Sequence, residues 1–322
     1  MKKFFVTTIA ALLTLSSTPV LAQQKIPIGQ MKGLEAAKLL ESIGDKARAT
    51  EVRNEVKANK SDTQLSLLWQ GSKKPKAYEY TNHAFGFIPA DAAGGQQLVD
   101  IKEAGNIAPD ASLKGRNIKI TLDRLRVFEY PGGGVHQVLF DFFGRHQTPG
   151  SEEDIHFSQT YRALEGQGAG ITGYPVFVGL KVGAEGVKFR VRTINVKNED
   201  DEKLLAFMNS DPFKNGLQLI NATNPMSSVV TKFATGIVDG IAKKDRNIPV
   251  QEFDMGLDFN AGIRTRAKLS EGSYIVVQEP EIAWDWTKWA YSPATGQVVS
   301  RTDPTKTIPY NYIVFSLSKI EE

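Results

Sequence analysis

Histidines and carboxylates form the first group of residues whose types and spacing could do chemistry. Three of the four histidines, His136, His146 and His156, are spaced ten residues apart. A carboxylate such as Asp141 or Asp154 would add a further zinc ligand, because zinc binds both imidazole and carboxylate groups. The closely spaced H-x-x-x-H and H-E-x-x-H patterns of zinc enzymes are absent. A zinc site therefore requires the fold to bring the three rings together, and the sequence equally fits a partly buried, hydrogen-bonded His136.

Two acidic clusters could bind calcium. One contains Glu153 and Asp154, the other contains Asp200 and Asp201, and both are expected in loops between regular elements. Calcium takes six to eight oxygen ligands, which loop carboxylates can supply. Neither cluster has the alternating D-x-D-x-D-G spacing of a preformed calcium loop. Solvated turns are the simpler prediction, calcium is the alternative, and no other cofactor is expected.

The segment EIAWDWTKWAYSPATGQ near the C-terminus holds three of the four tryptophans. If it is extended, Trp284 and Trp286 share one face with Asp285 on the other, and Trp289 and Tyr291 share a face after a turn. Such aromatic rings can close the core of a β-fold. Exposed rings helped by a carboxylate can instead hold a sugar. We predict that one pair closes the core and that the other faces a glycan or protein ligand.

The motifs of several enzyme classes are missing from the chain. There is no cysteine, so disulfides, thiol catalysis and cysteine metal sites are excluded. No G-x-S-x-G nucleophile motif occurs, and the glycine-rich run at 166–173 lacks the lysine of a phosphate-binding loop. A glycosidase needs only two suitably spaced carboxylates. A hydrolase that acts on carbohydrate or peptidoglycan through an Asp/Glu pair therefore remains an alternative to a protein without catalysis.

The first residues have the pattern of a bacterial signal peptide. Lys2 and Lys3 precede an uncharged, mostly apolar stretch from Phe4 to Leu15, and Val20 and Ala22 suit the positions three and one before a cleavage site. About a dozen apolar residues are too few to cross a bilayer as a helix. We expect cleavage after Ala22 and export to the periplasm or the medium.

The net charge gives no general reason to expect a nucleic acid partner. The chain has 39 basic and 36 acidic residues, and loss of Lys2 and Lys3 with the leader leaves 37 basic residues and a net charge of +1. Nucleic acid binding rests mainly on an excess of basic residues. No later segment is long and apolar enough to predict a transmembrane helix in the mature chain.

The hydrophobic pattern changes from a helical to a strand period along the chain. Residues 31–58 are expected to be helical with a break at Gly44, and 61–115 are irregular with strand-like pieces at Leu65–Trp69 and Ala84–Ile88. From residue 117 the period is two, with glycine and proline turns between short runs. Strands are expected at 117–130, 135–143, 176–182, 187–196, 251–259, 262–269, 273–279, 297–301 and 310–318.

A helical insertion is expected within this β-series at residues 199–244. Its second helix, 226–243, has apolar residues at the spacing of an amphipathic helix. The simplest interpretation is a helix that covers the sheet, and the alternative is a peripheral membrane protein that uses this helix. The stretch NIKITLDRLRVFE with the following glycine turn resembles the opening of C2-type sandwiches. It lacks the aspartates of their calcium-dependent members, so the resemblance implies no site residue.

These patterns predict a mainly β protein, with an antiparallel β-sandwich that carries the helical insertion and follows an N-terminal helical segment. The expected organisation is a signal peptide at 1–22, a helical and irregular region at 23–115, and the sandwich at 116–322. The function favoured by the sequence is that of an exported, soluble binding or interaction protein. The hydrolase and the membrane-associated protein are the two alternatives.

Overall fold

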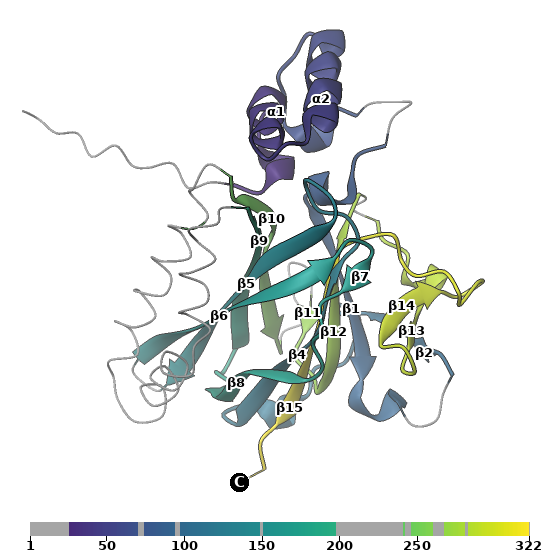
Figure 1. Ribbon diagram of the computed structural model, residues 1–322. Helices are drawn as coiled ribbons and strands as arrows, with labels where there is room; N and C mark the ends of the chain where they lie inside the picture. Colours follow the sequence, from purple (N-terminus) through teal and green to yellow (C-terminus); the bar gives the residue numbers. More distant parts are fainter. Residues whose placement is uncertain are drawn as a thin grey trace, which may run out of the picture.

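A computed structural model describes residues 26–69, 74–93, 97–148, 151–197, 241, 246–259, 267–280 and 283–321. The described residues form two β-sheets that pack face to face, a small third sheet, and two helices over one end of the sheets (Figure 1). The mainly β, antiparallel fold predicted from the sequence is confirmed, and so is the helical segment that precedes it.

The helices α1 (Gly33–Ser42) and α2 (Lys46–Asn59) are separated at Gly44, as the sequence predicts. Gly44 has a φ of 90°, a value that residues with a side chain rarely adopt, so the break falls where the backbone needs glycine. Asp45 then caps α2, because its carboxylate accepts a hydrogen bond of 3.1 Å from the backbone N–H of Arg48.

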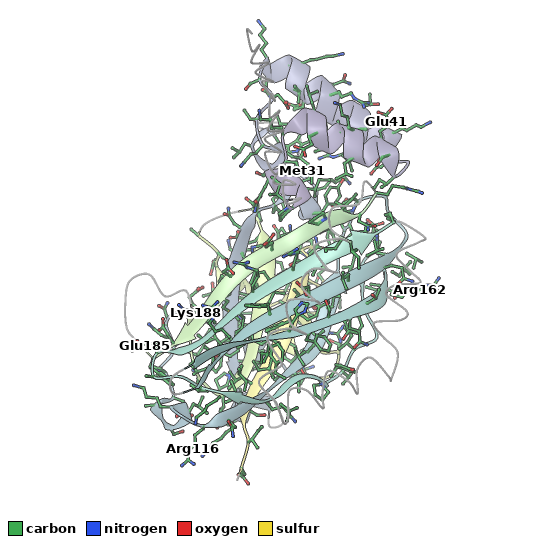
Figure 2. All side chains as sticks on the ribbon, turned by 90° about the vertical axis from the view of Figure 1, so that its left-hand side faces the viewer. Met31, Glu41, Arg116, Arg162, Glu185 and Lys188 are labelled. Carbon is green, nitrogen blue, oxygen red and sulfur yellow. The ribbon has the colours of Figure 1, made fainter. Side chains whose placement is uncertain are left out.

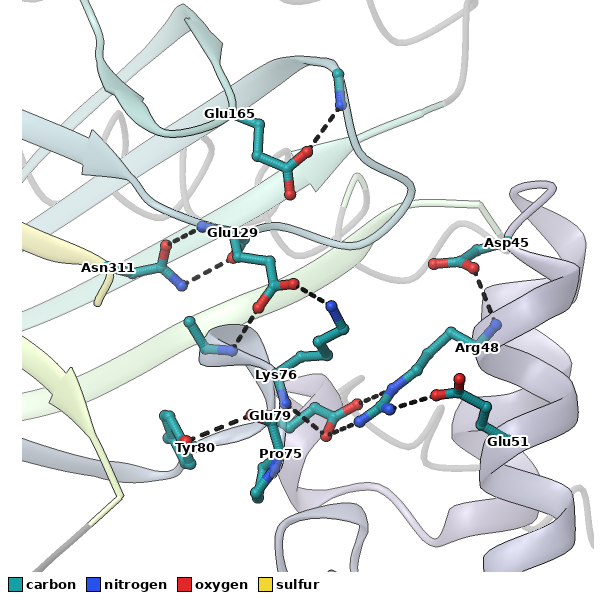
Figure 3. Close-up of polar contacts among 12 residues, drawn as sticks. Asp45, Arg48, Glu51, Pro75, Lys76, Glu79, Tyr80, Glu129, Glu165 and Asn311 are labelled. Atoms are coloured by element: carbon teal, nitrogen blue, oxygen red, sulfur yellow. Dashed lines mark hydrogen bonds and ion pairs between the residues drawn. The ribbon is translucent and has the colours of Figure 1, made fainter. Parts of the chain in front are cut away.

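Two carboxylates join the helices and the following segment to the sheets (Figure 3). Glu79, in the 3-10 turn η3 (Ala77–Glu79), accepts from Arg48 Nε at 2.9 Å and from the Arg48 terminal nitrogen at 2.7 Å. Glu129 follows the first long strand of the sandwich and accepts from Lys76 Nζ at 2.5 Å. The Arg48–Glu79 pair is buried, with side chains 7 % and 0 % exposed. Solvent therefore screens the attraction between these two charges only weakly.

The larger main sheet has seven strands and is antiparallel throughout. Its order is β3 (Lys102–Glu103), β1 (Asn82–Pro89), β12 (Gly272–Glu279), β15 (Tyr312–Lys319), β4 (Asn117–Val127) and β7 (Gln167–Gly168), with β8 (Tyr174–Lys181) also paired to β4. β1 contains the strand-like piece expected at Ala84–Ile88, inside the region otherwise expected to be helical and irregular, and it pairs with β12 along its whole length. The expected border at residue 116 therefore does not coincide with an edge of this sheet.

The second main sheet has five strands. Its order is β11 (Ala267–Lys268), β10 (Ile248–Asp258), β9 (Gly186–Val196), β5 (Val135–Thr148) and β6 (Ser151–Leu164). All neighbours are antiparallel except the two-residue β10–β11 pair, which is parallel. The glycine turn after β4 leads into β5, and β5 and β6 form a long hairpin.

The inner faces of the two main sheets share one hydrophobic core. Phe142 on β5 packs edge-on against Phe315 on β15, with ring centroids 5.7 Å apart. Near another edge, Phe85 on β1 packs against Phe253 on β10 at 6.0 Å. Because successive residues of a strand face opposite sides, the face of each sheet that carries these rings lies in the interior. The arrangement is the antiparallel sandwich that the sequence predicts.

A second core lies on the outer face of the seven-stranded sheet. The small sheet there contains β2 (Val99–Asp100), β13 (Trp289–Ser292) and β14 (Gln297–Ser300). Its buried residues join outward residues of the large sheet in one cluster, whose members include Val99, Ile275, Val277, Trp286, Val298 and Val314. The tryptophan segment therefore packs against the outside of the sandwich, beside this small sheet (Figure 1).

Two expectations about local structure are wrong, and a third falls almost entirely outside the described residues. The acidic stretch Ser151–Asp154 was expected to be a loop, but it begins β6. The strand expected at Leu65–Trp69 is also wrong, because Leu65–Leu67 forms the 3-10 turn η2. The insertion at 199–244 lies outside the described residues except for Ile241. The remaining 3-10 turns are η1 (Ile28–Gln30), η4 (Ala90–Ala93), η5 (Ala111–Leu113) and η6 (Trp286–Lys288).

Candidate functional site

The tryptophan segment is not a continuous strand. Asp285 accepts hydrogen bonds from the backbone N–H of Thr287 at 3.0 Å and from its hydroxyl at 2.5 Å. These bonds hold the pKa of Asp285 below its ordinary value and start the 3-10 turn η6 at Trp286. An aspartate bonded two residues on is a typical turn former. The turn redirects the chain before β13 begins at Trp289.

Because of this turn, the predicted pairing of the tryptophans is partly wrong. Trp284 stacks on Trp289, with ring centroids 6.1 Å apart and planes inclined by 13°. Trp286 meets Trp284 edge-on at 5.7 Å and is itself only 5 % exposed. Trp289 and Tyr291 do lie two residues apart on β13, and both are partly exposed. Trp286 is therefore the ring that closes the core. The partly exposed stack consists of Trp284 from one predicted pair and Trp289 from the other.

Gly86 explains how Trp286 reaches the sheet. A Cβ atom at Gly86 would lie 2.8 Å from the six-membered ring of the indole, closer than real contacts of this kind. Because Gly86 has no side chain, the flat indole ring of Trp286 packs directly against the backbone of β1. Trp286 anchors the segment, and this anchor holds the Trp284–Trp289 stack at the rim of the second core.

Two tyrosines from distant parts of the chain extend the aromatic row. Tyr310 packs edge-on against Trp284 at 5.4 Å, and Tyr80 lies 6.0 Å from Tyr310. Trp284, Trp289 and Tyr310 are partly buried against the second core and keep part of their surface in solvent. We call Trp284, Trp289, Tyr310 and Tyr80 the aromatic surface.

Charged groups border the aromatic surface near Trp289. Arg301 donates to Asp100 at 2.8 Å and, with a longer bond of 3.4 Å, to the carbonyl of Trp289. The side chains of Arg301 and Asp100 are 41 % and 76 % exposed. An exposed ion pair of this kind contributes little to stability, so Asp100 can exchange its partner at small cost. Arg301 is also held by a 3.1 Å hydrogen bond from its Nε to the carbonyl of Thr287. Flat rings and exposed polar groups thus meet at one place.

Tyr291 has different neighbours. Burial raises its pKa above the ordinary value, the charge of Asp123 raises it further, and Arg124 partly opposes this. Tyr291 therefore lies on the side of β13 nearer β4, which carries both charged residues. Tyr291 belongs to the candidate site because its ring lies on the same face of β13 as Trp289.

The structure does not bring the three spaced histidines together. His136 and His146 occupy one strand, β5, where ten residues separate their Cα atoms by roughly 33 Å. His136 is completely buried, and its pKa falls to about 4 because of burial and the positive charge of Lys197. His156 lies on β6, and its Nε2 contacts the carboxylate of Asp141, one of the two carboxylates expected beside a histidine.

The acidic clusters are only partly covered by the structure. Glu153 and Asp154 lie on β6, opposite His146 and Arg145 in the register of the hairpin. Asp200 and Asp201 lie outside the described residues. Within the described ranges, no three His, Asp or Glu side chains are grouped closely enough to hold a metal ion.

Two arrangements suggest hydrolysis but lack the necessary geometry. Ser158 donates to Asp141 at 3.0 Å, so serine and histidine both bond the carboxylate instead of forming the serine–histidine contact of a nucleophile.

Burial raises the pKa of both Glu103 and Asp123. These two residues lie on β3 and β4, four strand positions or roughly 19 Å apart. That separation exceeds the ~5–10 Å between the carboxylates of a glycosidase pair.

Comparison with known proteins gives no family: no protein-family model, no curated protein and no solved structure matches the chain. Among the described residues, no helix is long and apolar enough to cross a membrane.

Four members of the site were not predicted from the sequence: Tyr80, Tyr310, Arg301 and Asp100. Arg301 and Asp100 are 201 residues apart in the chain, so no local pattern links them. A local signal did exist for the turn at Trp286, because an aspartate followed two residues later by threonine favours a turn over a strand. Reading Asp285 and Thr287 in this way would have separated Trp286 from the strand.

Proposed function

We propose that this protein is an exported binding protein that holds a carbohydrate on the aromatic surface. The proposal rests on one observation: the partly exposed Trp284–Trp289 stack lies beside the exposed Asp100–Arg301 pair. A sugar ring carries C–H groups on its faces, which pack on flat apolar rings, and hydroxyls around its edge, which need hydrogen-bond partners. The aromatic surface supplies rings and polar groups together.

A carbohydrate fits this surface better than a protein ligand does. Protein interfaces commonly centre on an aromatic anchor in a dry, well-packed pocket. Here the indoles lie at the rim of the second core, next to charged side chains that remain in water. Such a border suits the hydroxyl groups of a glycan. A protein ligand is the outcome to consider if every glycan fails to bind.

Tryptophan fluorescence during titration with soluble oligosaccharides tests the proposal. Cello-, malto- and chito-oligosaccharides and peptidoglycan fragments cover the main chemistries, and we expect a spectral shift with at least one. Trp289→Ala should weaken that ligand about tenfold or more, since a ring at the centre of a contact is worth over ~1.4 kcal/mol. Trp284 stays in this variant as the reporter.

Two variants serve as controls. Trp289→Phe keeps a flat ring and should retain much of the affinity. Val178→Ala removes an apolar side chain that is 69 % exposed on β8, and it should bind as the wild type does. Absence of any shift, or equal affinity of Trp289→Ala and wild type, would refute the proposal.

Export is supported by the leader pattern of residues 1–22. The proposal predicts that the protein recovered from the periplasm or medium of a bacterial host begins at Gln23. Retention of Met1 in a cytoplasmic fraction would contradict it.

A further inference from the structure

The rings of the aromatic surface form a row that runs from the small sheet to one end of the seven-stranded sheet. Trp289 begins β13 in the small sheet, and the ring centroid of Trp284 lies 6.1 Å from its own. The ring of Tyr310, just before β15, follows at 5.4 Å from Trp284, and that of Tyr80, just before β1, follows at 6.0 Å from Tyr310. All four side chains are partly exposed. The two ends of the row therefore belong to different sheets.

The tyrosine end of the row lies at the end of the sandwich next to the helices. β1 and β15 both pair with β12, one on each side, and both begin where β12 ends. Tyr80 directly follows Glu79, which bonds Arg48 on α2. This is the end of the sheets near Met31, beyond which lies the helix pair with Glu41 (Figure 2). The order of the strands thus brings the two tyrosines together across the end of β12.

Buried amide groups fix the positions of both tyrosines. Asn311, which follows Tyr310, is completely buried; its side chain accepts from the backbone N–H of Phe128 at 2.9 Å and donates to Gln278 at 3.0 Å. Gln278 in turn donates to the carbonyl of Tyr80 at 2.7 Å. The anchored turn η6 fixes the other end of the row. A surface that is already ordered loses little conformational entropy when a ligand binds.

The planes of the rings turn along the row. The planes of Trp284 and Trp289 are nearly parallel, with an inclination of 13°. Tyr310 is inclined by 75° to Trp284, and Tyr80 is inclined by 57° to Tyr310. A rigid, flat ligand can therefore lie on the two indoles but not on all four rings. A ligand that also packs on the tyrosines must turn along its length.

Glycan chains differ in how much they turn. The β-linked glucose chain of cellotetraose is a flat ribbon, whereas each residue in the α-linked glucose chain of maltotetraose is rotated in the same sense, so that this chain curves. A pyranose ring is about as wide as an aromatic ring, so the row has room for about four sugar residues. The turn of the ring planes suits the curved chain.

From this geometry we infer that the aromatic surface binds a curved, α-linked glycan chain along about four consecutive residues. Trp284 and Trp289 would hold one half of the chain beside the Asp100–Arg301 pair. Tyr310 and Tyr80 would hold the other half and thereby select a curved chain over a flat one. This inference rests on the proposed function, because it concerns the same surface.

Maltotetraose and cellotetraose test the curvature, because they contain the same sugar and differ only in linkage. In tryptophan fluorescence titrations, we expect maltotetraose to bind at least about fivefold more tightly than cellotetraose, since only the curved chain gains the contacts with the tyrosine rings. Maltose, which is long enough for the indoles alone, should also bind at least about fivefold more weakly than maltotetraose.

The outcomes separate this inference from the proposed function. Cellotetraose binding as tightly as maltotetraose, or more tightly, would overturn the preference for a curved chain. Maltose binding as tightly as maltotetraose would overturn the extended row. In both cases a glycan still binds, so the proposed function would stand. If no glycan binds, both the function and the inference are refuted.

Tyr310→Ala tests the tyrosine end of the row directly. This variant should weaken maltotetraose about fivefold or more and leave the affinity for maltose nearly unchanged. Tyr310→Phe keeps a ring at the same position and should retain most of the affinity for maltotetraose. An equal loss for both sugars in Tyr310→Ala would refute the separate role of the tyrosine end.

Circular dichroism and thermal melting establish that each variant is folded. If Tyr310→Ala does not fold, Tyr80→Ala removes the last ring of the row and should still weaken maltotetraose by about threefold or more. Unchanged affinity for maltotetraose in every folded alanine variant of the two tyrosines would refute the inference.

Discussion

Removal of the Arg48 guanidinium should destabilise the fold strongly through the charge that it leaves behind. In Arg48→Met, Glu79 would remain completely buried and would keep the 3.0 Å hydrogen bond from the backbone N–H of Lys76, with the indole of Trp69 nearby. Breaking a buried ion pair by removal of one partner costs about 3–5 kcal/mol. Loss of the cation–π contact, in which Arg48 lies 4.1 Å from the ring centre of Trp69, adds about 0.5–2 kcal/mol.

The double variant Arg48→Met/Glu79→Gln separates the charge from the packing. A glutamine side chain can still accept the hydrogen bond from Lys76, and no buried charge remains. Replacing both members of a buried ion pair is often nearly neutral. We therefore expect the double variant to recover most of the loss and to fall within about 2 kcal/mol of the wild type.

Urea denaturation followed by circular dichroism measures these free energies of unfolding. Arg53→Met is the matched control, because it breaks the exposed Arg53–Glu41 pair, with side chains 34 % and 49 % exposed. That change should cost at most about 1 kcal/mol. A loss in Arg48→Met no larger than in Arg53→Met would refute the reasoning.

The pH dependence of stability gives an independent check that Glu79 is a buried charge in Arg48→Met. Burial raises the pKa of Glu79 above its ordinary value, and Arg48 opposes that rise. Without Arg48 the pKa must rise further, so the native state binds a proton more readily than the unfolded state does. Stability then increases as the pH falls through the native pKa. The deficit of Arg48→Met should shrink between pH 8 and pH 5, and a constant deficit would contradict a buried charge.

Two further predictions concern buried residues. The pKa of His136 falls from about 6.5 in the unfolded chain to about 4 in the fold, so the wild type should lose roughly 3 kcal/mol between pH 6.5 and pH 4. Urea midpoints of His136→Gln should lack this loss; an identical pH profile would contradict it. Gly86→Ala should cost about 1–3 kcal/mol by displacing Trp286. Its melting temperature should fall relative to Gly170→Ala, a substitution into open space, and equal values would count against a tight contact.

The alternation of apolar residues predicted most of the sandwich but not β6. This strand does carry a period of two, since Ile155, Phe157 and Tyr161 pack against the main core. Its first four residues are serine and acids, which favour a turn when they are judged locally. Pairing with β5 along the hairpin decides the outcome instead. Cross-strand pairing is a long-range property, so a rule based on local composition fails at such a strand.

The candidate site was harder to predict than the fold. The tryptophans were visible as a cluster, but strand alternation misplaced Trp286 because the turn at Asp285 interrupts the alternation. Arg301 and Asp100 meet only because β2 and β14 both flank β13. Their pairing depends on the order of strands in the small sheet, which no periodicity in the sequence encodes.

The arrangement of the two main sheets explains why the aromatic surface lies on an outer face. One face of each sheet lies in the shared core, where Phe142 and Phe315 meet. The outer face of the seven-stranded sheet gains a second core, and the aromatic surface forms at its rim. Because the aromatic surface lies outside the shared core, Trp289→Ala should weaken glycan binding without unfolding the sandwich. A changed far-ultraviolet circular dichroism spectrum in this variant would indicate damage to the shared core.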